Sequence, residues 1–299
     1  MSSSPEVTAQ TEALEGVFTL LGTPIGNLGD LSRRASQTLL DADVIAAEDT
    51  RRLRVLLSHL QIAGKEMLSV DANREEHFCS KVVELVRSGK TVVYTTDAGM
   101  PGISDPGAKL VKAVSSAGLR VDAVPGPSAS ILAASLSGFC ESGFLFPGFL
   151  SVKQGPRKRA LDGFATCGLA IVLFESPKRV AKLLEDAQSV YGPGHSVFLG
   201  RELTKLHQEL FYGTIEEAIS RLGSVDSRGE FAVVLAPKLD IDSPRNSAEI
   251  LELVVKALGS KVAGTKVLAS ELAEITGVKR TEVYDMLIEL RRSAASLSD

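Results

Sequence analysis

The chain has 299 residues, of which 44% are hydrophobic and 23% are charged, and its formal net charge is −4. At roughly 150 residues per domain, this length predicts two domains with room for a small third element. No apolar run approaches the ~18 residues that a membrane-spanning helix needs, and the negative net charge disfavours general binding of nucleic acid, because phosphate contacts need clustered Lys and Arg side chains.

The N-terminal segment, residues 1–16, is polar and lacks the basic start and the apolar core of a secretory signal, so we expect a flexible tail. The three cysteines, Cys79, Cys140 and Cys167, are odd in number and far apart in the sequence. This pattern argues against a disulfide framework and against a Cys-x-x-Cys metal clip. We therefore expect a cytoplasmic protein.

Short apolar runs alternate with helical patterns between residues 17 and 127. Strands are predicted at 17–21, 44–47, 67–70, 91–95 and 121–124, and helices at 31–40, 52–60, 75–87 and 108–117. Alternation of this kind predicts an α/β domain with a largely parallel sheet that helices cover on both faces.

A second α/β domain is predicted at residues 128–239, with a mixed pattern. We expect helices at 128–136, 177–189 and 215–222 and strands at 170–174, 197–199, 208–213 and 231–235. The polar segment 240–247 contains Pro244 and predicts a linker. Beyond it, residues 248–299 predict a small helical module with helices at 248–258, 266–276 and 279–291.

Three unusual loops follow predicted strands, at the sheet edge where open α/β proteins bind ligands. They read GTPIGNLG at 22–29, DAGMPGISDPG at 97–107 and PGPSA at 125–129, where Ser128 is the expected helix N-cap. None of these loops fits the glycine motifs of nicotinamide dehydrogenases or P-loop NTPases, and Gly-x-Ser-x-Gly is absent. These enzyme classes are therefore disfavoured.

Charged residues gather in two places. The segment 48–52, EDTRR, ends a predicted strand, where either a ligand role or helix capping by Asp49 or Thr50 with a surface ion pair is expected. In the second domain, Lys153, Arg157, Lys158 and Arg159 outnumber nearby acids, and charge alone favours a solvated helix face. The four histidines do not cluster at ligand spacing, so we predict no metal site.

Taken together, the ordered motifs resemble the tetrapyrrole methylase superfamily, and within it the branch that methylates small-subunit ribosomal RNA. The resemblance rests on the three loops and on AEDTR at 47–51, FPGFL at 146–150, FESP at 174–177, RELTK at 201–205 and AEITGVK at 273–279. The chain differs from that branch at Met100, at Gly102 and around residues 71–76.

The resemblance implies two α/β domains of the tetrapyrrole methylase type plus a small C-terminal helical domain. It also implies a homodimer that binds S-adenosyl-L-methionine between its α/β domains and 2'-O-methylates a cytidine of 16S rRNA, within the assembled small ribosomal subunit. The cofactor contacts that it implies are Pro24, Gly26, Gly99, Pro101, Ile103, Ser104, Ser128, Ala129, Phe174, Leu203 and Ala236.

Methyl transfer to a ribose hydroxyl needs alignment of the acceptor and a group that takes its proton. The catalytic candidates are Asp97, Glu48, Glu202 and Lys205, with Lys205 and Arg51 expected to orient the acceptor or its phosphate. Under the same resemblance, RNA contacts are expected from Arg51, Lys153, Arg157, Arg159 and Arg179.

Two alternatives remain open at the level of the sequence. A tetrapyrrole C-methyltransferase shares the fold and the cofactor, although it typically lacks AEDTR and the helical module. A non-catalytic RNA-binding factor of ribosome assembly would keep the fold without the reaction.

Overall fold

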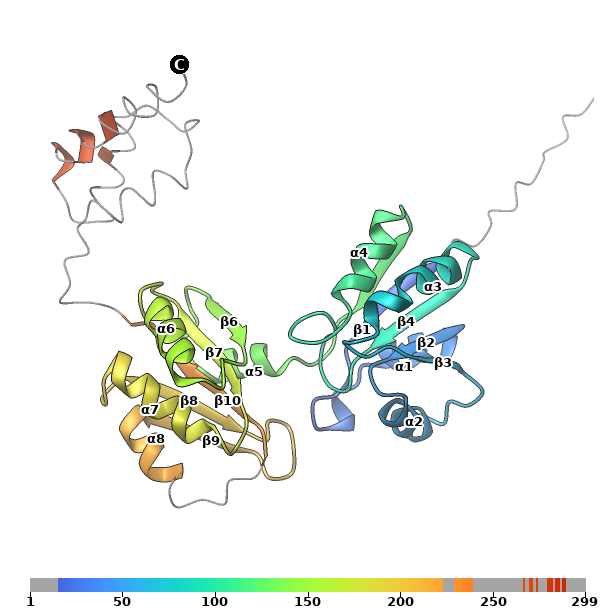
Figure 1. Ribbon diagram of the computed structural model, residues 1–299, viewed down its shortest axis with the longest axis horizontal. Helices are drawn as coiled ribbons and strands as arrows, with labels where there is room; N and C mark the ends of the chain where they lie inside the picture. The colour runs from blue at the N-terminus through green and yellow to red at the C-terminus, as the bar shows by residue number, and fades with distance from the viewer. Residues whose placement is uncertain are drawn as a thin grey trace, which may run out of the picture. The chain divides into compact units, whose positions relative to one another are not determined.

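The computed structural model describes residues 16–222 and 229–238 and scattered positions between 266 and 288. The chain divides into two compact units, Met1–Lys238 and Leu239–Asp299. Most of the described residues belong to the first unit, which contains two five-stranded sheets (Figure 1).

The first sheet has the order β3-β2-β4-β1-β5, and all of its neighbouring strands are parallel. Its strands are β1 (Val17–Leu21), β2 (Val44–Ala47), β3 (Glu66–Ser69), β4 (Thr91–Thr95) and β5 (Arg120–Val124). The intervening helices are η1 (Leu28–Asp30), α1 (Arg33–Asp41), α2 (Thr50–His59), α3 (Glu75–Arg87) and α4 (Ala108–Ser116). This arrangement confirms the predicted parallel α/β unit.

Alternating side chains place apolar residues on both faces of this sheet, as strand geometry requires. Ile45 and Val93 pack against α1 and α2 on one face, whereas Val44 and Val92 pack against α3 and α4 on the other. The two clusters explain why β2 reads as a continuous apolar run, because a strand buried on both faces needs no polar positions.

The second sheet is mixed and has the order β6-β7-β10-β8-β9. Strand β6 is parallel to β7, while β10 runs antiparallel to β7 and β8, and β9 antiparallel to β8. Its strands are β6 (Phe144–Gly148), β7 (Ala170–Glu175), β8 (Ser196–Arg201), β9 (Glu209–Thr214) and β10 (Phe231–Leu235), and its helices are α5 (Ala129–Ser137), α6 (Gln154–Ala165), α7 (Val180–Tyr191) and α8 (Ile215–Leu222).

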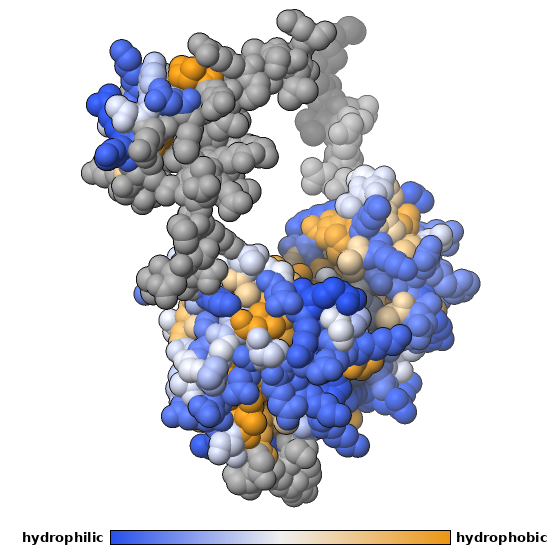
Figure 2. Space-filling model, turned by 60° about the vertical axis from the view of Figure 1, so that its left-hand side comes forward, coloured by the Kyte–Doolittle hydropathy of each residue, from blue (hydrophilic) through white to orange (hydrophobic). Residues whose placement is uncertain are grey.

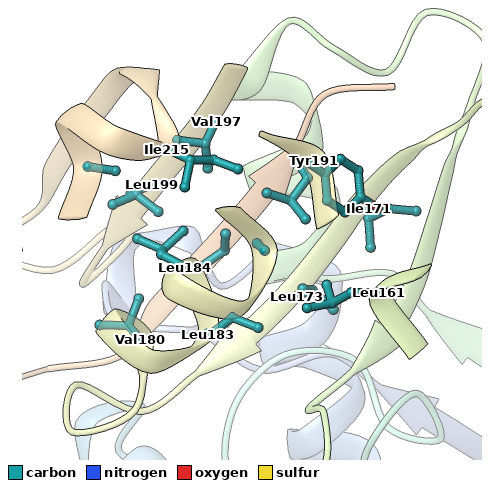
Figure 3. Close-up of a cluster of buried hydrophobic side chains, with 14 of the residues drawn as sticks. Leu161, Ile171, Leu173, Val180, Leu183, Leu184, Tyr191, Val197, Leu199 and Ile215 are labelled. Atoms are coloured by element: carbon teal, nitrogen blue, oxygen red, sulfur yellow. The ribbon is translucent and has the colours of Figure 1, made fainter. Parts of the chain in front are cut away.

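The surface is mostly hydrophilic with small apolar patches in the view of Figure 2, and the apolar side chains concentrate inside. Figure 3 shows the largest core of the second sheet, where Leu183 and Leu184 of α7 meet Ile171 and Leu173 of β7. Helix α5 covers the opposite face through Ala133 and Ala134. Burial of this kind stabilises a fold by about 25 cal/mol for each Å² of apolar surface.

Strand β6 and helix α6 were not predicted. Strand β6 contains Pro147 and Gly148, which disfavour a strand in sequence reasoning, and it lies at the edge of the sheet, where proline is tolerated. Helix α6 contains Pro156 in its first turn, where a helix needs no donor from the backbone. The proline and glycine residues therefore make both elements difficult to predict from the local sequence.

Among the described positions of the second unit, Lys266, Ala269, Val283 and Leu287 are helical, and Ala269, Val283 and Leu287 are buried. Residues 1–15 of the tail predicted at 1–16, the linker at 240–247 and the helix at 248–258 lie outside the described residues. In the part of the chain that the structure describes, no helix has the length and hydropathy needed to cross a membrane.

Candidate active site

Two loops are joined at the carboxyl edge of the first sheet. Thr23 and Gly99 form an isolated antiparallel bridge, with the Thr23 amide donating to the Gly99 carbonyl at 2.9 Å and the reverse bond at 3.1 Å. The Thr23 hydroxyl also donates to the Thr96 carbonyl at 3.1 Å. The loop after β1 therefore fixes the loop at 97–107.

A buried carboxylate holds the other end of the 97–107 loop. Oε1 of Glu75 accepts hydrogen bonds from the amides of Gly107, Lys109 and Leu110 at 2.9, 2.7 and 3.3 Å. These amides begin α4, where free donors and the helix dipole favour an anion. Glu75 thus supplies from α3 the cap that α4 lacks in its own sequence.

The 97–107 loop forms one wall of a groove with a volume of about 420 Å³. Ser104 has φ +60° and Gly99 has φ +81°, so the loop turns in the left-handed region. Gly148 of β6 lies against Ser104, because a Cβ atom built on Gly148 would be 2.7 Å from the Ser104 hydroxyl oxygen. The two sheets therefore meet at this wall.

The opposite wall comes from the second sheet, at the edge where β7 and β8 end and β10 begins. The groove is lined by Ile25, Ala98, Gly99, Met100, Ile103, Ser104, Asp105, Ser128, Ala129, Ser130, Phe146, Phe149, Phe174, Glu175, Ser176, Pro177, Gly200, Leu203, Lys205, Glu230, Phe231 and Ala232. Small-molecule sites have volumes of roughly 300–1,000 Å³ and mainly apolar walls, and this groove has the same character.

Three aromatic rings line the second-sheet side of the groove. Phe174 at the end of β7 makes edge contacts with Phe146 at 4.9 Å and with Phe149 at 5.8 Å between ring centroids. Glu175, which follows Phe174, is buried and forms an ion pair with Arg179 at 2.8 Å. The rings offer an apolar surface to a planar ligand, and the buried charge of Glu175 is compensated by Arg179.

Asp105 is the acidic residue of the loop that lines the groove. Burial, together with the negative charges of Glu48 and Asp97, raises the pKa of the Asp105 carboxyl to about 6. Asp105 is part of the 97–107 loop, but the sequence alone did not indicate it as a site residue. A carboxylate in this place can attract a cationic ligand.

Glu48 and Asp97 form an acidic pair at the carboxyl edge of the first sheet. The Asp97 amide donates to Oε2 of Glu48 at 3.4 Å, and Nε of Arg52 lies 3.2 Å from Oδ2 of Asp97. Burial is the largest cause that raises the pKa of both carboxyl groups. Asp97 lines a hollow of about 130 Å³, whereas its neighbour Ala98 lines the groove, so Asp97 lies at the border of the two cavities.

Glu202 and Lys205 come together at the far end of the groove. Nζ of Lys205 lies 2.9 Å from Oε1 of Glu202 and 3.0 Å from Oε2 of Glu230. Burial acts to raise the pKa of Glu202, but hydrogen bonds from Lys205 and from the Glu230 amide lower it on balance. Lys205 and Glu230 line the groove, whereas Glu202 does not.

Most of the predicted cofactor contacts line the groove. These are Gly99, Ile103, Ser104, Ser128, Ala129, Phe174 and Leu203. Pro24 lines the neighbouring hollow instead, and Pro101 is buried beside the groove without lining it. Gly26 lies against Lys205, because a Cβ atom built on Gly26 would be closer than 3.0 Å to the Lys205 side chain.

The structure does not place Ala236, which the resemblance implied as a cofactor contact, at the groove. Ala236 follows the carboxyl end of β10, where its amide donates to the Ser196 carbonyl at the start of β8. The groove lies at the other end of β10, because this strand runs antiparallel to β7. Glu230, Phe231 and Ala232, at the beginning of β10, line the groove.

The structure places Arg157, a predicted RNA contact, inside the protein rather than on its surface. It is only 5% exposed, and its guanidinium pairs with Asp186 at 2.6 Å. The same guanidinium donates to the carbonyls of Ser151 and Val152, at 3.2 Å each. Arg157 therefore joins α6, α7 and the 149–153 segment inside the protein.

The other predicted RNA contacts differ in exposure. Lys153 and Arg159 are exposed, and Arg179 is half-buried, with Nη2 donating to the Leu150 carbonyl at 2.8 Å. Arg51 is exposed and forms a close ion pair with Asp49, which also accepts from the Arg51 amide as the N-cap of α2. In the 48–52 segment, Asp49 thus caps α2 and forms the surface ion pair, and its partner Arg51 is also the residue predicted to contact RNA.

The sequence matches the family of tetrapyrrole (corrin/porphyrin) methylases over residues 17–219. The chain belongs to this family. Within it, the chain is 38% identical to ribosomal RNA small subunit methyltransferase I of Synechocystis sp. over 92% of this chain and 98% of that protein. The enzyme of the same name from Thermotoga maritima is 44% identical over 75% of this chain and 99% of that protein.

Solved structures of other enzymes share the fold. Diphthine synthase has a TM-score of 0.58 at 14% identity and covers 74% of this chain and 90% of that one. Uroporphyrin-III C-methyltransferase from Thermus thermophilus, solved with S-adenosylhomocysteine, has a TM-score of 0.52 at 21% identity over 74% and 96% of the two chains. The predicted fold of the tetrapyrrole methylase type is thereby confirmed.

Among the described residues, no group of three or more His, Cys, Asp and Glu side chains is arranged to hold a metal ion. His195, for example, lies beside Tyr191 and contacts the Ala236 carbonyl through Nε2 at 2.9 Å.

Proposed function

We propose that this protein uses S-adenosyl-L-methionine to 2'-O-methylate a cytidine ribose in 16S rRNA. The observation that carries the proposal is the groove between the two sheets, built from the motifs that define the methylase family. The relatives named ribosomal RNA small subunit methyltransferase I match nearly the whole chain, which supports RNA rather than a tetrapyrrole as the acceptor.

The residues of the groove fit this cofactor. Phe146, Phe174 and Leu203 offer an apolar surface for the adenine ring. Gly99 and Ala129 leave the backbone accessible for hydrogen bonds to the polar parts of the ligand. The Asp105 carboxylate faces the same space and can balance the positive ammonium and sulfonium groups. The cofactor, when bound, supplies an electrophilic methyl group.

The chain contributes alignment and proton transfer. Transfer needs the ribose oxygen in line with the bond from sulfur to the methyl carbon, and correct positioning supplies much of the acceleration. Lys205 lines the groove and remains a cation through its contacts with Glu202 and Glu230, so we assign it to orienting the acceptor or its phosphate.

Asp97 is the proposed acceptor of the hydroxyl proton. It lies at the border between the groove and the neighbouring hollow, and its raised pKa makes it a better base than an ordinary aspartate. Glu48 supports this role through its hydrogen bond to the Asp97 amide. The Arg52 guanidinium, 3.2 Å from Oδ2 of Asp97, acts to lower this pKa and so limits its rise.

RNA contacts are proposed for three exposed cations and one half-buried cation. Lys153 and Arg159 lie at the N-cap of α6 and within it, and Arg51 lies at the N-terminus of α2. Arg179 contributes through its half-buried guanidinium. We further propose that the acceptor is the assembled small ribosomal subunit, that the enzyme is a homodimer and that it acts in the cytoplasm, as the family resemblance implies.

The deciding experiment measures transfer of labelled methyl from S-adenosyl-L-methionine to small ribosomal subunits that lack the modification. Sequencing that detects ribose methylation then maps the product. One new 2'-O-methylated cytidine supports the proposal. Cofactor binding without transfer to any RNA contradicts it, and a labelled precorrin or porphyrin in a parallel assay favours the tetrapyrrole alternative. Absence of both activities favours a non-catalytic assembly factor.

A further inference from the structure

An exposed aromatic ring stands at the mouth of the groove. Phe149 is 61% exposed, although it is a large apolar side chain and lines the cavity. Phe146 and Phe174 from the same wall are half-buried. Phe149 touches Phe174 with its ring edge-on, at 61° between the ring planes. This contact leaves much of the Phe149 ring open to solvent.

The backbone around Phe149 is held in place by contacts on both sides. Gly148 has φ +73° and packs against Ser104 of the opposite wall. On the other side, Arg179 donates to the Leu150 carbonyl at 2.8 Å, and Arg157 donates to the Ser151 and Val152 carbonyls. An exposed ring on a segment with this many fixed points is pre-organised for a ligand, because binding need not order the segment.

Exposed cations lie close in sequence to residues that line the groove. Lys153 follows Phe149 on the same segment, and Lys178 follows Ser176 and Pro177, which line the groove. Both lysine side chains are exposed. An exposed aromatic face at the groove, with basic side chains on the segments that carry it, matches the chemistry of single-stranded nucleic acid, whose bases stack on rings while its phosphates contact cations.

We propose that Phe149 is a stacking platform for the base of the acceptor nucleotide, which the enzyme receives unpaired. This inference rests on the proposed RNA methylation and adds a specificity residue to it. Stacking on Phe149 places the base at the mouth of the groove and turns the attached ribose toward the methyl donor. A base inside a duplex has no free face for such a contact, so the acceptor must be single-stranded or extruded.

The test compares three substitutions at this position. Phe149→Ala removes the ring, Phe149→Leu keeps apolar bulk without an aromatic face, and Phe149→Trp keeps a stacking surface. Leu40→Ala is the matched control, because Leu40 is an apolar residue that is 49% exposed on α1 and lines no part of the groove. The measurements are kcat/KM for unmodified small ribosomal subunits and the calorimetric Kd of S-adenosyl-L-methionine.

We expect Phe149→Ala and Phe149→Leu to lower kcat/KM for the subunits about tenfold, as loss of one base stack does. Phe149→Trp and Leu40→Ala should stay within about threefold of the parent, and the cofactor Kd should change by less than about threefold in every variant. Equal activity of Phe149→Leu and Phe149→Trp overturns the inference, since apolar packing then suffices.

A fall in cofactor affinity that matches the fall in kcat/KM also overturns it, because Phe149 would then serve the cofactor. Methyl transfer by the parent enzyme distinguishes these outcomes from failure of the proposed function. If the parent transfers no methyl to RNA, the proposed function fails. If the parent is active and the Leu variant is equally active, only the stacking role fails.

Discussion

The charge of the Asp105 carboxyl affects how strongly the groove attracts a cationic ligand. Asp105 has a pKa of about 6 because burial and the neighbouring carboxylates disfavour its charged form. A positive ligand favours that charged form, so binding and ionisation are coupled. Below about pH 6 the carboxyl is protonated in the free protein and loses its attraction for the sulfonium and ammonium groups.

We therefore predict that Asp105→Asn weakens binding of S-adenosyl-L-methionine about tenfold at pH 8, in line with the loss of one charge-assisted contact. The parent should lose affinity as the pH falls through about 6, while the variant should show a flatter profile. Calorimetric titration between pH 5 and pH 8 checks both expectations. A variant that keeps the pH dependence of the parent would assign it to another group.

Asp97 is expected to act on turnover rather than on cofactor binding. Replacement by Asn keeps the shape but removes the base, so Asp97→Asn should lower kcat about 100-fold. In the parent, kcat should fall with decreasing pH, because only the ionised form of Asp97 accepts a proton. The midpoint of this fall should lie above the ordinary pKa of aspartate, because burial raises the pKa of Asp97. Asp122→Asn, an exposed change on β5, is the control in the same methyl-transfer assay. Intact turnover in Asp97→Asn would exclude this base.

The positions of site residues could be predicted where the local sequence determines them. Ser104 and Ser128 follow parallel strands or begin a helix, so the motif and the strand-end rule both place them at the groove. The position of Ala236 away from the groove could not be predicted, because the direction of β10 is a property of the sheet and not of the strand sequence. The burial of Arg157 could not be predicted either, because its partner Asp186 is 29 residues away and only the packing of α6 on α7 brings them together.

At the scale of elements, the pair of α6 and α7 depends on the buried charges of Arg157 and Asp186. The Asp186 side chain is only 3% exposed, so loss of Arg157 leaves an anion without its main partner. Breaking a buried pair in this way costs about 3–5 kcal/mol, whereas replacing both partners by apolar residues is often neutral. The pair also anchors the 149–153 segment through the Arg157 guanidinium.

We predict that Arg157→Met lowers the free energy of unfolding by about 3 kcal/mol in urea titrations, and that adding Asp186→Leu recovers most of the loss. Lys158→Met is the control, because Lys158 lies 3.7 Å from Asp186 but is more exposed and should contribute less than about 1 kcal/mol. If Arg157→Met leaves stability unchanged and weakens RNA binding instead, Arg157 contacts RNA and the pair with Asp186 is not needed for stability.

Element boundaries were predictable where the apolar period is clear. Helix α3 and strands β1, β2 and β4 occur at the predicted residues, because each has a buried face that the sequence pattern displays. The cap of α4 was not predictable. Glu75 stands 32 residues before Gly107, and no local motif marks their contact. Long-range contacts of this kind appear only when the helices pack.

At the scale of the whole molecule, a net charge of −4 must be reconciled with an RNA acceptor. Several acidic residues gather at the carboxyl edge of the first sheet, where Asp105 lines the groove and Asp97 the neighbouring hollow, so the total charge understates the cations available to RNA. The exposed Lys153 and Arg159 lie at the start of α6 and within it, and the exposed Lys178 follows Pro177 of the groove in the sequence. Local distribution rather than total charge is therefore the relevant quantity for binding.

This argument predicts the salt dependence of RNA binding. Each cation that contacts a phosphate releases counterions, so its loss reduces the slope of log K against log salt by roughly 0.7–0.9. Combined Lys153→Gln and Arg159→Gln should therefore lower the slope for small ribosomal subunits by about 1.5 and weaken binding most at low salt. Lys112→Gln, an exposed change on α4, should leave the slope unchanged. An unaltered slope in the double variant would return both residues to the role of solvated surface, and the phosphate contacts would then have to come from Arg51 and its neighbours on α2.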